Sequence, residues 1–372
     1  MLSTQNIFLG VKMSLKKLSK INRVRNYRKT KKEFLRLDMA EKLDNYNKIF
    51  FNTFLKKLSQ EDFITYPSYQ EYEQLIKKIA KLNSCSSSNI YFDTGSDACI
   101  KNFFQVFLNK KDEILITQPS FPMYSVYAEG FELKIKKIKF NNKNEISIES
   151  ICNSISSKTK VVILANPNSP YGDYKNKNEI SKLLKFLKKK NINLILDEAY
   201  VEFSKGSMID LLDRYSNLFI LRTFSKAWGA AGCRVGYIIS NEKNIEYLLK
   251  TQITFPITCV SVKFITYLID NKKYIFDQIS QSIKDRDIFC NLLEANNFDV
   301  IRSSTNSIHF HEKNSDNSRI VKILNKHKVG FKYGSNIGTP IFVAGDKRKT
   351  WIRISVGKNI HKTKYIKEIL KL

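Results

Sequence analysis

Polar and charged residues follow four short apolar runs of the sequence, one group after each run. The groups are Gly95, Ser96 and Asp97 after the run 90–92, Asn166 after 161–165, Asp197 and Tyr200 after 193–196, and Ser225 and Lys226 after 218–221. Each group alone has an ordinary structural explanation, because Ser96 or Asp97 can cap a helix and a single lysine is usually a surface residue. Together they indicate a ligand site at one edge of a parallel sheet, where open α/β folds bind ligands.

The residue types in these groups match the needs of pyridoxal 5'-phosphate. This cofactor requires a lysine amine for its aldehyde, a carboxylate that keeps its pyridine nitrogen protonated, and donors for its phosphate. Lys226 can supply the amine, and Asp197 at the end of a buried strand can hold the charged nitrogen. Asn166 and Tyr200 are suited to the phenolic oxygen of the ring. The phosphate would bind at the turn Gly95-Ser96-Asp97, which opens a helix, and at Ser225 and Arg234.

The sequence lacks the other common nucleotide-binding and metal-binding motifs. Gly229, Gly232 and Gly236 do not have the spacing of a dinucleotide fingerprint, and no GxxxxGK[ST] phosphate loop occurs. The acidic end of the run 191–198 therefore does not indicate a nucleoside triphosphatase. The six cysteines form no CxxC pair and the four histidines are widely spaced, so we predict no metal site.

Alternating strand-like and helix-like patterns predict the elements that position these groups. Strands are predicted at Ile90–Phe92, Glu113–Thr117, Val161–Ala165, Asn193–Leu196, Leu218–Leu221 and Val235–Ile239, and helices at 97–108, 178–190 and 242–250. Another helix is predicted over 68–82, where Ser68 and Glu71 have the spacing of a capping box. Short apolar runs that alternate with helices are typical of a mainly parallel α/β sheet covered by helices.

The pattern changes after about residue 255. Long amphipathic helices over 262–296 precede shorter strands at Ser307–Phe310 and Trp351–Val356. We therefore predict a large cofactor-binding domain over 51–255 and a small C-terminal α+β domain over 256–372, which the N-terminal segment 1–50 completes. Within that segment, residues 12–36 hold eleven Lys or Arg and a single acid, Glu33.

The composition favours a folded protein of the cytoplasm. Apolar residue types make up 42% of the 372 residues, which is enough to bury a core. No stretch reaches the roughly 18 apolar residues of a spanning helix, and the N-terminus lacks the features of a secretory signal. Cysteines this scattered indicate a reducing compartment. The net charge of +28 allows a nucleic-acid partner, although lysines on polar faces of apolar patterns favour a solvated surface.

Six segments carry a resemblance to a known family: DTGSDA, PSFPMY, NPNSPYG, DEAYVEF, RTFSKAWGAAGCRVGY and WIRISVG. They are similar to the successive signatures of the fold-type I aminotransferases of class I/II, which depend on pyridoxal phosphate. The resemblance is greatest to the histidinol-phosphate aminotransferase branch and runs from about Tyr66 to Gly357. It implies a large domain of mainly parallel sheet, a smaller α+β domain, and a homodimer with its active sites at the subunit interface.

The resemblance also implies a role for each candidate residue. Lys226 would bond to the cofactor aldehyde and then move a proton at the substrate. Asp197 would pair with the pyridine nitrogen, and Asn166 and Tyr200 would bond the phenolic oxygen. The phosphate would be held by Gly95, Ser96, Asp97, Ser225 and Arg234. Phe121 occupies the position whose ring stacks on the cofactor. Tyr66 would reach the cofactor phosphate of the neighbouring subunit, and Arg353 would grip the carboxylate or phosphate of the substrate. Core packing is the alternative explanation for Phe121 and Tyr66.

Two departures from the branch bear on the substrate. The segment 37–42 lacks the Asn and Pro of the branch's N-terminal element, and Lys332 stands in the region 329–334 where the branch carries a second arginine. Lys332 can replace that arginine as a point charge, without the bidentate fork. The loop from Gly334 to Trp351 is also longer than usual. We therefore expect a small, phosphate-bearing substrate other than histidinol phosphate.

Three functions follow from these observations. An aminotransferase would move an amino group from glutamate to a small keto or aldehyde acceptor, and this is the function that we favour. A decarboxylase of a phosphoserine- or phosphothreonine-like amino acid would use the same residues but would break a different bond at Cα. A nucleic-acid-binding protein would use residues 12–36, and its affinity would fall steeply with salt. We expect neither a nucleic-acid nor a membrane partner.

Overall fold

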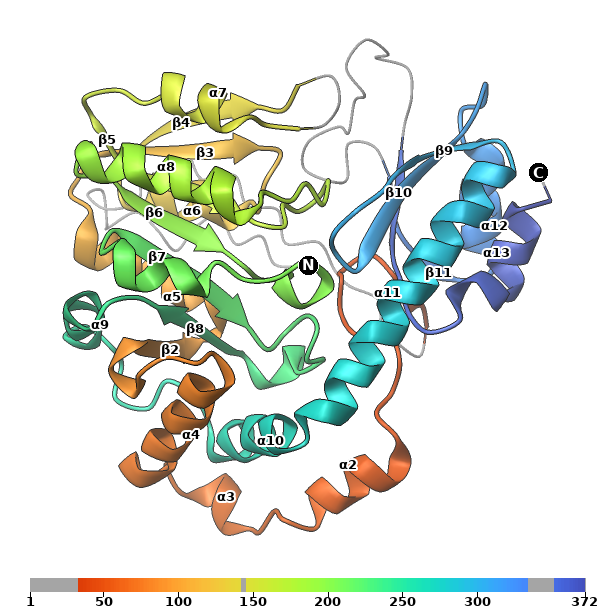
Figure 1. Ribbon diagram of the computed structural model, residues 1–372. Helices are drawn as coiled ribbons and strands as arrows, with labels where there is room; N and C mark the ends of the chain where they lie inside the picture. The colour runs from red at the N-terminus through yellow and green to blue at the C-terminus, as the bar shows by residue number, and fades with distance from the viewer. Residues whose placement is uncertain (1–32, 142–144, 334–350, 372) are drawn as a thin grey trace, which may run out of the picture.

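The computed structural model describes residues 33–141, 145–333 and 351–371. Its largest element is a seven-stranded sheet with the strand order β2-β8-β7-β6-β5-β3-β4 (Figure 1). The strands are β2 (Ile90–Thr94), β3 (Glu113–Gln118), β4 (Lys134–Lys139), β5 (Thr159–Ala165), β6 (Asn193–Asp197), β7 (Leu218–Thr223) and β8 (Val235–Ile239). Strands β4, β3, β5, β6 and β7 pair in parallel, and β8 is antiparallel to β2 and β7. The predicted α/β class with a mainly parallel sheet is confirmed.

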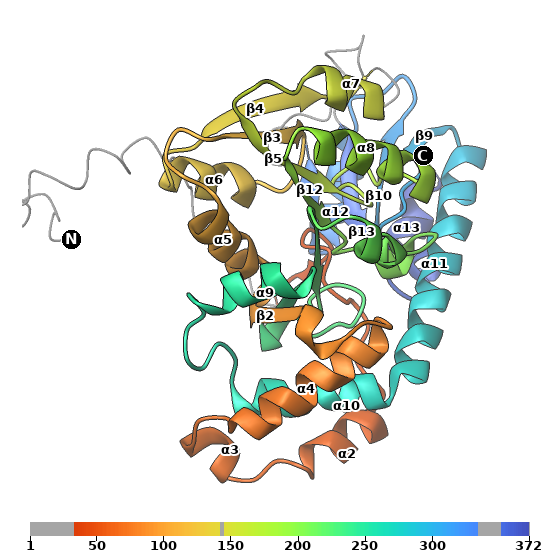
Figure 2. The ribbon, with the colours of Figure 1, turned by 60° about the vertical axis from the view of Figure 1, so that its left-hand side comes forward.

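Helices cover both faces of this sheet (Figure 2). One face packs with α5 (Gly95–Phe107), α6 (Met123–Gly130) and α9 (Glu242–Leu249), and the other with α4 (Tyr69–Leu82), α7 (Ile148–Asn153), α8 (Lys177–Lys189) and α10 (Cys259–Asp270). Neighbouring residues of a strand point to opposite faces, so that Ile163 belongs to the first core and Leu164 to the second. Burial on both faces explains why the predicted strands are continuous apolar runs.

The predicted strands and helices of this region are present, with ends shifted by a few residues. The capping box at the start of α4 forms as expected, because the Ser68 hydroxyl accepts from the N–H of Glu71 and the Glu71 carboxylate accepts from the N–H of Ser68. Strand β4 was not predicted. Its sequence, KIKKIK, is rich in lysine because β4 is an edge strand that is mostly exposed.

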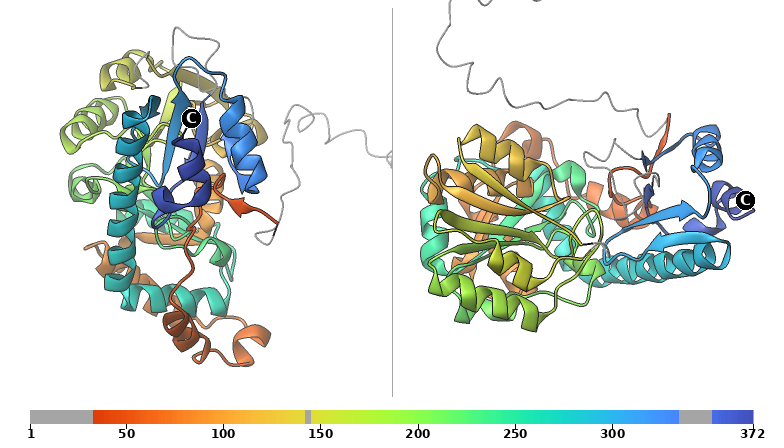
Figure 3. Two further views of the ribbon diagram at one scale, coloured as in Figure 1. Left: turned by 90° about the vertical axis from the view of Figure 1, so that its right-hand side faces the viewer. Right: turned by 90° about the horizontal axis from the view of Figure 1, so that it is seen from above.

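A second, four-stranded antiparallel sheet has the order β12-β13-β10-β9. Its strands are β9 (Phe298–Ile301), β10 (Ser307–Glu312), β12 (Lys332–Tyr333) and β13 (Ile352–Ser355). Its apolar face packs on α11 (Lys272–Ala295), α12 (Ser318–Lys326) and α13 (Lys364–Ile369). The long helix α11 packs in a core of the large sheet with its first half and in the core of the second sheet with its second half. It thus connects the two sheets along one side of the molecule (Figure 3). The predicted domain boundaries at 50 and 255 stay a prediction.

The N-terminal segment forms a separate two-stranded sheet with a strand from the C-terminal part of the chain. Strand β1 (Leu35–Arg36) pairs in parallel with β11 (Val329–Gly330), and α2 (Lys48–Leu55) and α3 (Glu61–Ile64) follow. Residues 12–32 of the basic stretch 12–36, and the whole loop between Gly334 and Trp351, lie outside the described residues. Of the helices in the described ranges, none has both the length and the apolarity needed to cross a membrane.

Candidate active site

Lys226 follows β7 on a loop that packs against the N-terminal segment. Its Nζ donates a hydrogen bond to the Met39 carbonyl oxygen at 3.2 Å and lies 5.6 Å from the centre of the Tyr200 ring. Three residues later Gly229 has a φ of +75°, and a Cβ at this position would lie 2.3 Å from Cδ of Lys42. The positive φ favours glycine here, and a larger residue would also displace the Lys42 side chain. The segment around Met39 therefore packs directly on the lysine loop.

Asp197 ends β6 and is buried, with 6% of its surface exposed. The Tyr124 hydroxyl donates to its Oδ2, and the N–H of Ala199 donates to its Oδ1 at 3.0 Å. Burial raises the pKa of Asp197 to about 6 despite these two donors. A buried carboxylate with a raised pKa is stabilised by a cation placed beside it. This is the environment that a protonated pyridine nitrogen would find there.

Phe121 lies next to Tyr124, the hydrogen-bond partner of Asp197. Its ring lies edge-to-face with the Tyr124 ring, with 5.6 Å between the ring centres, and 36% of its surface is exposed. Phe121 lies in the loop after β3, and Tyr124 lies in the first turn of α6. An exposed ring next to the partner of Asp197 can stack on a ligand ring, which is the arrangement expected for Phe121.

The first turn of α5 forms a second part of the site. The residue before Gly95, Thr94, makes no side-chain capping bond, so the first N–H groups of the helix are available to an anion. The Arg234 guanidinium lies over Gly95, where a Cβ would be 2.4 Å from Nη2. Strand β8 approaches as closely, because a Cβ on Gly236 would lie 2.2 Å from the backbone nitrogen of Ser96.

Asp97 and Ser225 complete this region. The Asp97 carboxylate lies 3.8 Å from the Arg234 guanidinium, so it can orient the arginine, although only its backbone N–H could donate to a phosphate. Ser225 is buried at the end of β7, and its N–H donates to the Thr223 hydroxyl at 3.1 Å. The helix terminus, the arginine and the serine together form a cradle of suitable charge for a phosphate.

Asn166 already uses its side-chain amide within the chain. Its Nδ2 donates to the Lys175 carbonyl at 2.9 Å, and its Oδ1 accepts from the Lys175 N–H at 2.7 Å. One N–H of the amide remains for a ligand. Asn168 is equally buried, and among the described residues neither its Oδ1 nor its Nδ2 has a hydrogen-bond partner. Asn168, which the sequence places in the same polar group as Asn166 but without a predicted role, therefore has the greater capacity for a ligand.

Arg353 reaches this site from the second sheet. Its Nη2 donates to the Asp38 carbonyl at 3.0 Å, and the Tyr200 side chain lies close enough to interact with its charge. Burial lowers the pKa of Arg353 from its usual value. Lys332 lies opposite Arg353 in the β12–β13 pairing, so the two side chains share one face of the sheet. Both predicted substrate-binding residues thus lie on the face that carries Arg353 toward Tyr200.

Tyr66 lies apart from these residues. Its ring stacks on Phe255, with 4.3 Å between the ring centres, and 75% of its surface is exposed. The neighbouring side chains of Phe63, Ile64 and Tyr69 are also largely exposed. Tyr66 is therefore available to another molecule and is not held by the site of its own chain.

A buried network holds the loop around Lys226. The Glu198 carboxylate accepts from Arg222 Nε at 3.0 Å and Nη2 at 2.8 Å, and also from the N–H of Met208 at 2.7 Å. Close by, Trp228 Nε1 donates to the Glu202 carboxylate at 3.0 Å. Glu198 therefore fixes the segment after β6 to β7, and the loop that carries Lys226 starts from a rigid base.

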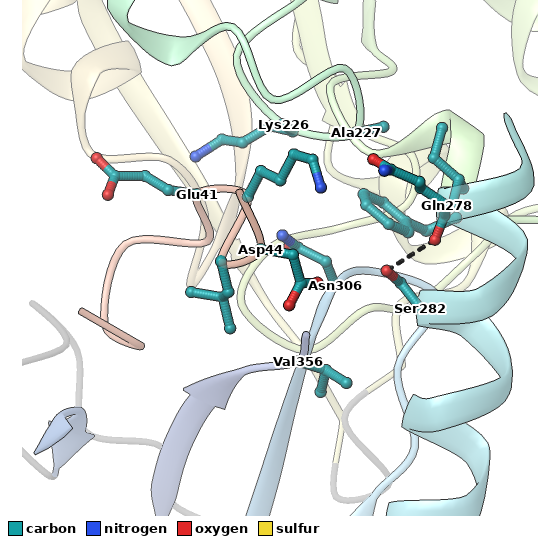
Figure 4. A pocket seen from close by; sticks show the side chains of 12 residues that line it. Glu41, Asp44, Lys226, Ala227, Gln278, Ser282, Asn306 and Val356 are labelled. Carbon is teal, nitrogen blue, oxygen red and sulfur yellow. Dashed lines mark hydrogen bonds between the residues drawn. The ribbon is translucent and has the colours of Figure 1, made fainter. Parts of the chain in front are cut away.

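A pocket lies beside Lys226, between the N-terminal segment, α11 and the second sheet (Figure 4). Its walls include Glu41, Lys42, Leu43, Asp44, Phe203, Lys226, Ala227, Gln278, Ile279, Ser282, Asn306 and Val356. Figure 4 shows the Lys226 amine pointing away from Gln278 and Ser282 of α11, toward the side where Glu41 lies. The lysine therefore forms one wall of the pocket and does not direct its amine at α11.

These observations fit pyridoxal phosphate. A lysine amine lies beside a tyrosine, a buried carboxylate has a raised pKa, and an uncapped helix terminus lies under an arginine. Residues 27–370 match the family model for aminotransferase class I and II. The chain belongs to this family. Its members depend on pyridoxal phosphate, and the chain is accordingly an aminotransferase-family enzyme that uses this cofactor.

Relatives place the chain within the aminotransferase family more closely. It is 29% identical over 273 residues to the histidinol-phosphate aminotransferase of Methanococcus aeolicus, covering 70% of this chain and 73% of the relative. Its fold resembles that of the histidinol-phosphate aminotransferase of Sinorhizobium meliloti in complex with pyridoxal-5'-phosphate, with a TM-score of 0.76, 20% identity, and coverage of 90% of this chain and 88% of that one. It also resembles the L-threonine-O-3-phosphate decarboxylase of Porphyromonas gingivalis, with a TM-score of 0.73, 19% identity, and coverage of 91% and 100%. The predicted resemblance to the histidinol-phosphate aminotransferase branch is confirmed.

Sequence analysis missed Tyr124, although the motif PSFPMY contains it three residues after Phe121. The spacing alone gave no reason to connect it with Asp197, because the contact spans 73 residues of sequence. The hydrogen bond from Lys226 to the Met39 carbonyl was also missed. Every residue type has a backbone carbonyl, so the identity of Met39 gave no signal for this contact.

Proposed function

We propose that this aminotransferase moves an amino group from glutamate to a small keto or aldehyde acceptor that carries a phosphate. The observation that supports this most is the grouping of Lys226, Tyr200 and Arg353, which come from three distant parts of the sequence. Transamination requires three groups on one side of the cofactor: an amine that transfers a proton, a hydroxyl, and a guanidinium that binds the substrate.

In this proposal each residue has a defined task. When bound, the cofactor supplies an electron sink for the carbanion at the substrate Cα. The Lys226 Nζ would take the proton from the substrate Cα and return it at C4′ of the cofactor. The Asp197 carboxylate keeps the pyridine nitrogen protonated, because a buried negative charge favours a positive partner. Tyr200 and the remaining N–H of Asn166 orient the phenolic oxygen.

The cofactor would be positioned from its two ends. At one end the first turn of α5, Ser225 and Arg234 bind its phosphate. At the other end Asp197 holds the ring nitrogen, and Phe121 stacks on the ring. Because the Tyr124 hydroxyl donates to the Asp197 carboxylate, that carboxylate would offer the ring nitrogen a partner held in one place.

The substrate class follows from Arg353 and Lys332. Two cations on one sheet face suit a dianion, and the names of the curated relatives support a phosphate-bearing substrate. The lysine is a point charge where a second arginine is expected, which changes the geometry of phosphate binding. We therefore propose a phosphorylated substrate other than histidinol phosphate.

We also propose that the protein is a homodimer, in which Tyr66 of one subunit reaches the cofactor phosphate of the other. The exposure of Tyr66 beside Phe63, Ile64 and Tyr69 supports this, because exposed apolar clusters commonly mark protein interfaces. Analytical ultracentrifugation should give twice the chain mass, and Tyr66→Phe should weaken cofactor binding several-fold. A monomeric protein with unchanged cofactor affinity in Tyr66→Phe would contradict the proposal.

We place the enzyme in the cytoplasm. All six cysteines lie in the described residues and are unpaired, as expected in a reducing compartment.

The decisive experiment is an absorbance spectrum of the cofactor-loaded protein before and after excess L-glutamate. Loss of the band of the lysine-linked cofactor, with gain of the band of its amine form, is expected. Lys226→Ala should lack the first band and all turnover, whereas the exposed control Lys205→Ala should behave as the parent. If glutamate leaves the band unchanged and phosphothreonine-like substrates release carbon dioxide, the enzyme is a decarboxylase and the proposal is wrong.

A further inference from the structure

The four-stranded sheet has one apolar face and one face that carries rings and charges. Alternate residues of β10 and β13 enter the core with α11, α12 and α13: Ile308, Phe310, Ile352 and Ile354. The residues between them, His309 and Arg353, must therefore point to the opposite face. On that face the His309 ring lies 6.3 Å from the ring of Tyr171, which follows β5 of the large sheet. The polar face of the second sheet thus looks toward the large sheet.

Three side chains lie in a row on this face. His309 is directly opposite Arg353 in the β10–β13 pairing, and Lys332 is directly opposite Arg353 in the β12–β13 pairing. Side chains paired in this way have Cβ atoms about 5 Å apart. Arg353 occupies the centre of the row and interacts with Tyr200, which lies against Lys226. The row therefore borders the proposed reaction site.

His309 is the member of this row whose chemistry is unexplained. Its side chain is fully buried, and neither Nδ1 nor Nε2 has a hydrogen-bond partner in the part of the chain that the structure describes. Burial and the nearby Arg353 hold the pKa of His309 well below its usual value. The ring is then neutral and keeps one N–H donor. Because buried polar groups in proteins are nearly always hydrogen-bonded, a donor that has no acceptor among the described residues is a candidate to bind a ligand.

We propose that His309 is a specificity-determining residue, whose ring N–H donates to a phosphate oxygen of the substrate next to Arg353. This inference rests on the proposed function and defines its substrate class more narrowly. A guanidinium fork satisfies both oxygens of a carboxylate by itself. A phosphate monoester has a third terminal oxygen, and Lys332 and His309, on either side of Arg353, are positioned for the oxygens that the fork leaves. The row thus selects phosphate over carboxylate.

The test compares the binding of two anions to the cofactor-loaded enzyme. Inorganic phosphate and acetate are titrated by calorimetry at constant ionic strength and pH, which requires no turnover. His309→Leu should weaken phosphate binding about ten-fold, as the loss of one hydrogen bond to a charged group predicts, and should change acetate binding less than two-fold. His309→Asn and His309→Gln each keep an N–H at the position of one ring nitrogen, so at least one of them should recover most of the phosphate affinity.

A matched control is available in the same domain. His327 lies at the end of α12, paired with Glu368 at 2.8 Å, and is separate from the row. His327→Leu should leave both affinities unchanged. Equal losses of phosphate and acetate affinity in His309→Leu, or unchanged phosphate affinity, would overturn the inference. If glutamate does not convert the cofactor but phosphate binding still depends on His309, the proposed function fails while the phosphate subsite stands.

Discussion

Asp197→Asn should change the pH dependence of stability in the cofactor-free protein. Burial raises the pKa of Asp197 from 3.8 to about 6, so the folded state holds this proton more tightly than the unfolded state. The stabilising contribution of the proton is complete below pH 3.8 and is lost as the pH rises through 6. The full loss is about 3 kcal/mol, since one pKa unit is worth about 1.36 kcal/mol. Asparagine cannot ionise and loses nothing.

The accessible window lies between pH 5 and pH 8. Over this range, ionisation of Asp197 should lower the free energy of unfolding by roughly 1 kcal/mol, because part of the effect already occurs below pH 5. Urea unfolding of both proteins, at equal protein concentration, measures this difference. Relative to the parent, Asp197→Asn should gain roughly 1 kcal/mol in the free energy of unfolding on going from pH 5 to pH 8.

In the cofactor-loaded enzyme, the same substitution should be unfavourable, because it should weaken cofactor binding. A pyridinium beside Asp197 would favour the ionised carboxylate. Replacing that carboxylate with the neutral amide of asparagine should therefore weaken cofactor binding about a hundred-fold or more. Asp213→Asn, which changes an exposed aspartate, serves as the control and should alter neither property. A stability difference between the parent and Asp197→Asn that is the same at pH 5 and pH 8 would refute the assigned burial effect.

Three further substitutions test the surrounding structure. Gly236→Ala places a Cβ 2.2 Å from the backbone nitrogen of Ser96, so it should cost about 1–3 kcal/mol in urea unfolding and weaken cofactor binding; normal affinity would show that the cradle can yield. Glu198→Gln leaves the buried Arg222 without its counter-charge and should cost about 3 kcal/mol in urea unfolding, whereas a cost below about 1 kcal/mol would mean that water compensates. Ser68→Ala removes the capping box of α4 and should cost about 1 kcal/mol of thermal stability without affecting cofactor binding; reduced cofactor affinity would connect α4 to the site.

Local sequence patterns were sufficient for six of the seven strands of the large sheet. Strands such as β5 and β6 are buried on both faces, and this produces apolar runs that can be recognised without a partner strand. Strand β4 could not be recognised, because an edge strand is half-solvated and its lysines obscure the alternation. The polar groups after each run were also predictable, since the ends of parallel strands meet at one edge.

Contacts between distant segments could not be derived in this way. The hydrogen bond from Tyr124 to Asp197, and the packing of the Met39 carbonyl on Lys226, depend on where two loops meet in space. Asn168 and Asn166 are the same residue type two positions apart. Only their surroundings show that Asn166 is already bonded to the backbone while Asn168 is not.

The sequence by itself determined the fold class, the cofactor and the residue types that bind it, because strand burial and pyridoxal chemistry both depend on local residue identity. The tertiary structure alone decided which side chains share the polar face of the second sheet. His309, Arg353 and Lys332 belong to three strands, and they form a row only because of the register in which β10, β13 and β12 pair. A shift of one residue would turn any of these side chains into the apolar core, and register is set by packing between strands that are distant in sequence.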